Sequence, residues 1–212
     1  MIGATRPAGL KTRLYERDSV LSSELQVALA PTASYQRFLS SSGSGPAEAG
    51  HYVRSLRRPA MVVLVIAVMS PIMAVQHVTV GLVATAALSW SFAVVLQSIV
   101  GLGIIASAPA RRITVLAALD LWFAGHVPYS LWIMVGFAAI TIMPFRSLGV
   151  LIGSAIVPAI WTAFIVAAFC RTVLGTTASG ARWRAAAHFV SIWAITSSYI
   201  AWAAGGWFQL LP

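Results

Sequence analysis

The longest stretch of the chain without a charged residue runs from Pro59 to Ala110 and is almost entirely apolar. Its 52 residues would form about 78 Å of helix at about 1.5 Å per residue, whereas the hydrocarbon core of a bilayer is about 30 Å thick. The polar segment 76–81 interrupts the stretch. The pattern therefore predicts two membrane-spanning helices, at about 60–75 and 82–107, joined by a turn.

Three further apolar segments follow, and arginines separate them. They cover residues 113–145, 147–170 and 185–211. The first would form about 50 Å of helix, which is too long for one straight crossing. Two arrangements remain open for it. Either 113–125 is a half-helix that leads into one crossing, or the whole segment is a hairpin of two short helices.

The first 58 residues have a different character, because they contain eight of the 14 basic residues and four of the five acidic ones. Within residues 11–30, five apolar side chains fall on one helical face. These are Leu14, Leu21, Leu25, Ala28 and Leu29. The pattern is typical of an amphipathic helix that lies on a membrane or a partner, and a weakly ordered tail is the alternative. Residues 40–46 have the composition of a flexible Ser/Gly linker.

The overall composition excludes a soluble globular fold. Hydrophobic residues make up 59% of the chain and charged residues only 9%, against roughly 25% charged residues in soluble domains. A single cysteine excludes a disulfide-stabilised scaffold. The sequence therefore predicts an all-α integral membrane protein with five transmembrane helices and a flexible basic amino-terminal tail.

The basic residues are distributed unevenly between the expected loops, and this predicts the orientation. With five crossings and a cytoplasmic tail, thirteen basic residues face the cytoplasm and only Arg146 faces outward. Six crossings would leave eleven inside and three outside, so the positive-inside rule favours five, with an external carboxyl terminus. Arg54, Arg57 and Arg58 precede the first crossing, where we expect them to contact lipid headgroups rather than nucleic acid. The arginine- and alanine-rich composition is typical of a bacterial protein, so the expected location is the bacterial inner membrane.

Asp120 is the only acidic residue beyond the first 58 residues, and it lies within an apolar segment. A carboxylate at membrane depth is costly and by default indicates a function, such as proton transfer or cation binding. An ion pair or helix cap near the cytoplasmic interface, with Arg111 or Arg112, is the structural alternative. His126 and Tyr129 follow in the same segment and complete this set of candidate intramembrane residues.

The histidines are candidates for binding haem or a pigment, or for carrying protons. The chain has four of them, His51, His77, His126 and His188. The predicted topology puts His77 at the outer side and His188 toward the inner side, and it leaves the depth of His126 open. We therefore do not expect two histidines at one depth, as a haem between two histidines requires. The sequence also lacks a haem attachment motif and zinc-binding spacings, which leaves a single-histidine site at His126.

Small and polar residues within the apolar segments predict contacts between helices. Gly149 and Gly153 open the fourth expected crossing, and small residues four apart let a second helix approach closely. Several polar residues lie at membrane depth, where they either line a permeation path or form hydrogen bonds between helices. They are Gln97, Ser98, Thr196, Ser197, Ser198 and Tyr199.

The layout of residues 59–212 resembles the Yip1 domain family, whose members have a polar cytoplasmic amino-terminal region, about five closely spaced helices and a short external carboxyl end. Residues 125–132, GHVPYSLW, are similar to the glycine-aromatic-proline region in the middle helix of that family. The acidic-leucine-tyrosine-glycine-proline motif that precedes the family's first helix has no counterpart in this sequence. The resemblance implies a helical membrane adaptor and no particular reaction.

The sequence contains no Ser-His-Asp set, phosphate-binding loop or pair of carboxylates in its apolar part, so we expect a non-enzymatic protein without a metal or cofactor. The predicted role is a scaffold, assembly or accessory subunit of a larger membrane complex, with lipids and other subunits as its partners. One alternative is a small proton- or ion-coupled transporter or channel that uses Asp120. A second alternative is a subunit that binds haem or a pigment through His126. The sequence does not identify a small-molecule substrate, which stays unknown.

Overall fold

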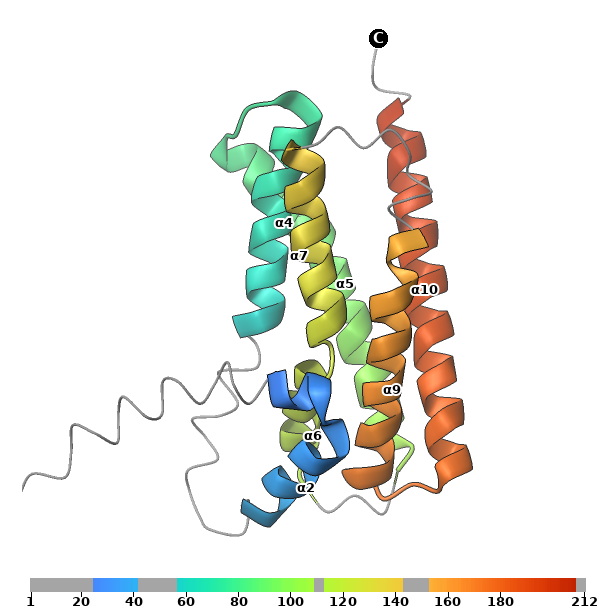
Figure 1. The fold of residues 1–212 in the computed structure, drawn as a ribbon. Coiled ribbons are helices and arrows are strands. Elements are labelled where there is room, and N and C mark those ends of the chain that lie inside the picture. Colours follow the sequence, from blue (N-terminus) through green and yellow to red (C-terminus); the bar gives the residue numbers. More distant parts are fainter. Residues whose placement is uncertain (1–24, 42–56, 109–112, 143–152, 209–212) are drawn as a thin grey trace, which may run out of the picture.

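The computed structural model describes residues 25–41, 57–108, 113–142 and 153–208. The long elements in these ranges are α-helices, which confirms the predicted all-α fold. They are α2 (Pro31–Ser41), α4 (Arg57–Val75), α5 (Val80–Ala106), α6 (Val115–Ala124), α7 (Val127–Ile142), α9 (Ile156–Thr172) and α10 (Ala178–Phe208). Figure 1 shows α4, α5, α7, α9 and α10 running along one common direction, with α2 and α6 at one end.

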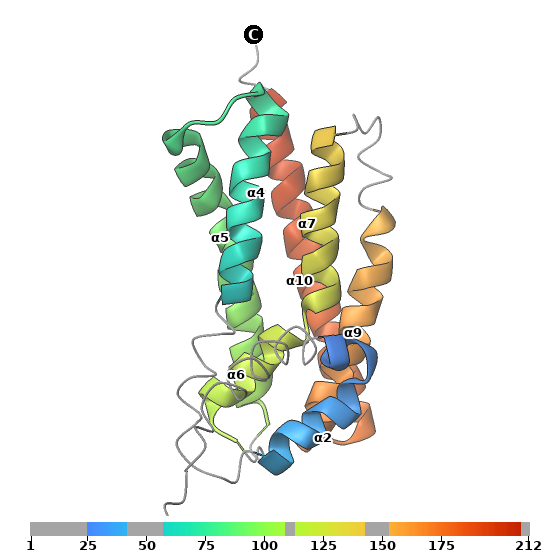
Figure 2. The same ribbon diagram turned by 60° about the vertical axis from the view of Figure 1, so that its left-hand side comes forward.

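The long helices form a closed ring. Helix α4 packs against α5 and α7, α9 packs against α7 and α10, and α10 returns to α5. Figures 1 and 2, which view the molecule from two directions, agree with this arrangement. Because each helix of the ring has a neighbour on both sides, side chains from different helices meet in its interior.

The two ends of the ring differ. The end that carries α2 and α6 also contains the loop 173–177 between α9 and α10, whereas the loop 76–79 between α4 and α5 lies at the opposite end (Figure 1). We call the first the tail end. There Arg184 of α10 donates hydrogen bonds to the backbone oxygen of Ser107 at 2.9 Å and to its hydroxyl at 3.0 Å. These bonds connect the start of α10 to the end of α5.

The segment that is too long for one crossing forms two successive helices. Thr114 precedes α6, and its hydroxyl accepts a hydrogen bond from the backbone N–H of Ala117 at 3.2 Å. Gly125 ends α6, and α7 begins two residues later. In Figure 2, α6 lies at the tail end and leads into α7, which is one of the helices of the ring. The segment thus contains a short helix followed by a longer one. That α7 crosses a membrane stays a prediction.

Part of the predicted tail belongs to the hydrophobic core. Tyr35 of α2 is fully buried, its hydroxyl donates a hydrogen bond to the backbone oxygen of Leu121 at 3.4 Å, and its ring meets Phe169 edge-on. Of the predicted apolar face, Ala28 is also buried, whereas Leu25 and Leu29 are 49% and 73% exposed. That this face lies on a membrane or a partner stays a prediction. The earlier part of the expected amphipathic helix lies outside the described residues.

Helix length identifies one candidate for crossing a membrane among the described residues. Helix α5 is long and apolar enough, with a mean hydropathy of 1.9. Apolar helices of 10–17 residues occur within α4, α6, α7 and α9. Helix length thus supports a membrane crossing by α5 alone, and it does not establish the other four expected crossings.

Candidate functional site

Two histidines from distant parts of the chain meet inside the ring. His126 lies in the turn between α6 and α7, and His188 lies on α10. Their Nε2 atoms are 3.0 Å apart, and the two side chains are only 3% and 4% exposed. The expectation that no two histidines share a depth is wrong for this pair. Helix α10 begins at Ala178 rather than at 185, so His188 lies about 15 Å from its start, level with the beginning of α7.

The hydrogen bonds determine where the protons lie on the neutral pair. The backbone oxygen of Trp122 can only accept, so His126 Nδ1, which lies 2.8 Å from it, carries a hydrogen and donates it. The Nε2 atom of a neutral His126 is then an acceptor, so His188 Nε2 must donate to it. His188 Nδ1 is left as the unprotonated nitrogen. This atom is buried and has no hydrogen-bond partner within the described part of the chain.

This proton placement predicts the tautomers of the two rings. In protein labelled with nitrogen-15 histidine, we expect His126 as the Nδ1–H tautomer and His188 as the Nε2–H tautomer, because the Trp122 carbonyl fixes the first and the first fixes the second. Nitrogen NMR spectra distinguish protonated from unprotonated ring nitrogens, and single His→Gln variants assign the signals. The reverse pair of tautomers would contradict the proposed placement.

Trp122 packs against both histidines. Its ring centroid is 4.9 Å from the centroid of each imidazole, and its side chain is 1% exposed. Its Nε1 donates a hydrogen bond to the backbone oxygen of Gln97 on α5 at 3.2 Å. This close approach requires Gly101, because a Cβ atom there would lie 2.6 Å from the indole Nε1. A glycine of α5 thus makes room for the ring that holds the histidine pair in position.

The smaller of two cavities beside the pair has a volume of about 20 Å³. His126, His188, Thr162 and Trp193 contribute to its lining. The Nδ1 of His188, the Oγ1 of Thr162 and the Nε1 of Trp193 are all buried and lack a hydrogen-bond partner within the described residues. A water molecule needs about 10–15 Å³ and two or more polar partners. The cavity therefore fits one water, which would accept a hydrogen bond from the indole and donate one to the imidazole.

The larger cavity has a volume of about 50 Å³ and lies between α4, α5, α7 and α10. It shares Gln97, His126 and Tyr129 with the smaller cavity, and Ser130 and Thr196 add further polar groups to its lining. Pockets for small organic molecules typically have about 300–1,000 Å³. The two cavities therefore have room for water but not for an organic ligand, and they bring Gln97 and Thr196, two of the predicted polar residues, to the interior of the ring.

The other predicted intramembrane residues have different surroundings. Asp120 is partly buried on α6, at the tail end, and lines neither of the two cavities. Tyr129 lines both of them, and its ring stacks on that of Trp132. The structure thus brings His126 and Tyr129 together with His188 but leaves Asp120 outside this site.

The predicted packing and lipid-contact residues are only partly described by the structure. Gly153 is exposed, and a Cβ atom there would meet nothing within 4 Å, so it does not admit a neighbouring helix within the described chain. Contact between chains at this glycine stays a prediction. Arg57 and Arg58 begin α4. Gly149, Arg54 and His51 lie outside the described residues.

A haem or pigment at His126 does not fit this arrangement. Both ring nitrogens of His126 already contact other atoms of the chain, at 2.8 Å and 3.0 Å. Two histidine nitrogens on opposite sides of a metal would be about 4 Å apart, at about 2.0 Å per metal–nitrogen bond. The Nε2 atoms of His126 and His188 are 3.0 Å apart, which is too close for a metal between them. The described residues also contain no group of three or more His, Cys, Asp or Glu side chains that could hold a metal ion.

No protein-family model matches the chain, and no curated protein or solved structure matches it either. The resemblance to the Yip1 domain family therefore stays a prediction. Its residues 125–132 form the turn after α6 and the first part of α7, and they include His126. Sequence reasoning singled out His126 but not its partner. The signal for His188 is its place in a stripe of buried positions along α10, and these are Ala181, Ala185, His188 and Ile192.

Proposed function

We propose that this chain is a multi-pass protein of the bacterial inner membrane that conducts protons through its helical ring, with the His126–His188 pair as the proton-binding site. The observation that carries the proposal is the 3.0 Å contact between two buried imidazoles beside water-sized cavities. Ionisable groups inside a membrane bundle are expensive and mark proton or ion pathways by default. Histidine is the side chain that exchanges a proton most readily near neutral pH.

The outer surface of the ring supports the membrane location. Large apolar side chains on several of its helices are 61–79% exposed. They include Leu88, Val135, Phe164 and Val190. An apolar surface of this kind is unfavourable in water and compatible with hydrocarbon. We therefore propose that α4, α5, α7, α9 and α10 each cross the membrane.

The arginines support the orientation. Arg171 lies at the end of α9, and Arg182 and Arg184 lie at the start of α10, so all three are at the tail end. By the positive-inside rule the tail end faces the cytoplasm. The carboxyl terminus then faces outward, as the sequence predicts.

The proposed proton transfer uses the unprotonated nitrogen of the pair. A proton from water in the smaller cavity binds His188 Nδ1, which converts His188 to an imidazolium. His188 then passes its Nε2 hydrogen across 3.0 Å to His126 Nε2, so that the positive charge moves to His126 and His188 is neutral again. In both of these states the carbonyl of Trp122 accepts the Nδ1–H of His126, and the Trp122 ring, 4.9 Å from each imidazole, can stabilise either imidazolium. The His126 imidazolium then loses its Nδ1 proton toward the tail end when Trp122 moves, and both rings turn to regain their starting tautomers.

The cavities suggest the side from which protons arrive. The larger cavity adjoins the smaller one at Gln97, His126 and Tyr129. It is also lined by Trp90 and Thr196, which lie farther from the tail end along α5 and α10. Toward the tail end, the buried rings of Trp122 and Phe169 belong to the hydrophobic core. We infer that the pair exchanges protons with the external side, and that release to the cytoplasm requires Trp122 to move.

Proton entry into liposomes tests this proposal. Purified protein is reconstituted with a trapped pH-sensitive dye, and a potassium gradient with valinomycin makes the lumen negative. We expect the protein to acidify the lumen faster than protein-free liposomes, and His188→Gln to reduce the rate to that background because an amide cannot accept the proton. His77→Gln is the matched control, since His77 is exposed in the loop between α4 and α5 and should leave the rate unchanged.

His126→Gln is measured in the same way. Far-UV circular dichroism and gel filtration of each variant separate loss of conduction from loss of the fold. A wild-type rate equal to that of protein-free liposomes would overturn the proposal. Full conduction by well-folded His188→Gln would also overturn it.

Two measurements separate the proposal from its alternatives. Asp120→Asn should conduct normally, whereas it should be inactive if Asp120 were the proton carrier. The predicted accessory-subunit role stays a prediction, and a stoichiometric partner in native membranes together with no proton flux would favour it.

A further inference from the structure

A groove on the outside of the ring joins a cationic mouth to an apolar section. The apolar section lies between α9 and α10, has a volume of about 300 Å³ and is lined by Phe164 and Phe189 among other apolar side chains. The mouth lies between α2 and the tail-end parts of α9 and α10, has a volume of about 980 Å³ and contains Arg171 and Arg182. Phe164, Ala167 and Arg182 line both parts, so the groove is continuous.

The mouth attracts anions. Arg171 and Arg182 are exposed, and Arg182 donates from Nε to the backbone oxygen of Ala178 at 3.4 Å. Asp120 is the only acidic residue within the described ranges, and it lies on α6 and does not line the groove. The side of the mouth formed by α2 contributes hydroxyl and amide groups from Thr32 and Gln36, which can also bind phosphate oxygens.

We propose that this groove binds one anionic phospholipid, with its phosphate at Arg171 and Arg182 and an acyl chain along the apolar section between α9 and α10. A ligand with a negative head and an apolar tail matches both parts, whereas an acidic peptide or a nucleic acid matches only the mouth. The head lies at the tail end, where the arginines place the cytoplasmic interface. The inference rests on the proposed membrane location and not on the histidine pair.

Native mass spectrometry with added lipids tests the headgroup contact. The protein in mild detergent is incubated with phosphatidylglycerol or phosphatidylcholine, and we expect it to retain one phosphatidylglycerol and to lose phosphatidylcholine. The double variant Arg171→Gln/Arg182→Gln should bind phosphatidylglycerol about 30-fold more weakly, the factor for two arginine contacts. Arg37→Gln is the matched control, because Arg37 of α2 donates to the Gln26 side chain at 2.7 Å and does not line the groove.

A second pair of variants tests the acyl-chain contact. Ala186→Trp places a bulky ring in the apolar section and should abolish lipid retention, whereas Ala187→Trp, at an exposed position outside the groove, should retain the lipid. Both positions are exposed, so neither change disturbs the core. Equal retention of the two lipids would overturn the proposal. Full lipid retention by the double arginine variant or by Ala186→Trp would also overturn it. So would binding of glycerol phosphate, which lacks acyl chains, as tightly as phosphatidylglycerol.

Discussion

Trp122→Ala is expected to lower the free energy of unfolding by about 3–5 kcal/mol, the range for truncating a fully buried large aromatic side chain. The ring of Trp122 is 1% exposed and contacts Phe169 of α9 as well as both histidines. The substitution also removes the hydrogen bond from Nε1 to the Gln97 carbonyl. Since α5, α9 and α10 all meet at this ring, the loss leaves a cavity that no single helix can fill by moving. Unfolding in micelles with increasing sodium dodecyl sulfate, followed by circular dichroism, measures the change.

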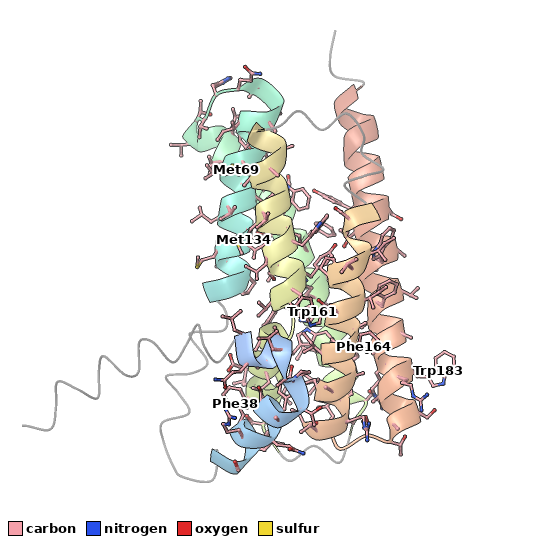
Figure 3. The ribbon with its side chains drawn as sticks, viewed as in Figure 1. Phe38, Met69, Met134, Trp161, Phe164 and Trp183 are labelled. Atoms are coloured by element: carbon pink, nitrogen blue, oxygen red, sulfur yellow. The ribbon has the colours of Figure 1, made fainter. Side chains whose placement is uncertain are left out.

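Trp183→Ala is the matched control for this prediction. Trp183 lies on α10, is 75% exposed and projects away from the helices (Figure 3). The same truncation at an exposed position should change the free energy of unfolding by no more than about 0.5 kcal/mol. If both variants lost the same stability, the ring of Trp122 would not be the packing centre that the structure indicates.

The helices themselves are the part of the fold that the sequence predicts best. An apolar stretch bounded by arginines has few alternatives to a helix, so the expected segments 60–75 and 82–107 lie close to the observed α4 and α5. The predicted helix boundaries are wrong where the apolar pattern is weak. Helix α10 starts seven residues before the predicted position 185. Residues 178–184 are helical, but they are mostly polar and small and so show no apolar pattern.

The contacts between helices could not be predicted from the sequence. Which side chains meet across a ring depends on the rotation and level of each helix, and an evenly apolar helix gives no information on either. His126 was a candidate because a histidine in an apolar segment is conspicuous, but its contact with His188 depends on the levels of α7 and α10. Asp120 was a candidate for the same reason, and the short helix α6 places it at the tail end.

The packing role of α2 was hidden for another reason. Its sequence is mostly polar, and its aromatic contacts with the core come from Tyr35 and Phe38 alone. A periodic pattern needs several apolar residues on one face, so two aromatic residues three positions apart in a short helix give only a weak signal. Gly125 gives the corresponding clue on the other side, because a Cβ atom there would lie 3.0 Å from the Tyr35 hydroxyl. Neither residue indicates the contact without the other.

Gly101→Ala and Gly103→Ala are expected to have opposite effects on stability, although they are two residues apart on α5. Alanine favours a helix over glycine by about 1 kcal/mol, and this gain applies at both positions. At Gly103 a Cβ atom meets nothing within 4 Å, so the variant should be more stable by up to about 1 kcal/mol. At Gly101 the Cβ atom would lie 2.6–2.9 Å from three atoms of the Trp122 indole. Overpacking of this kind costs about 1–3 kcal/mol and should outweigh the helix gain.

The comparison of these two variants also tests the link between packing and the proposed proton pathway. The indole of Trp122 cannot yield easily, because Phe169 and both histidines surround it. A methyl group at position 101 must therefore displace the ring together with the imidazoles that it contacts. We expect Gly101→Ala to slow proton entry into liposomes at a temperature where the variant is still folded, while Gly103→Ala conducts like the wild type. Equal stability and equal conduction in the two variants would show that the close approach at Gly101 does not hold the histidine pair in position.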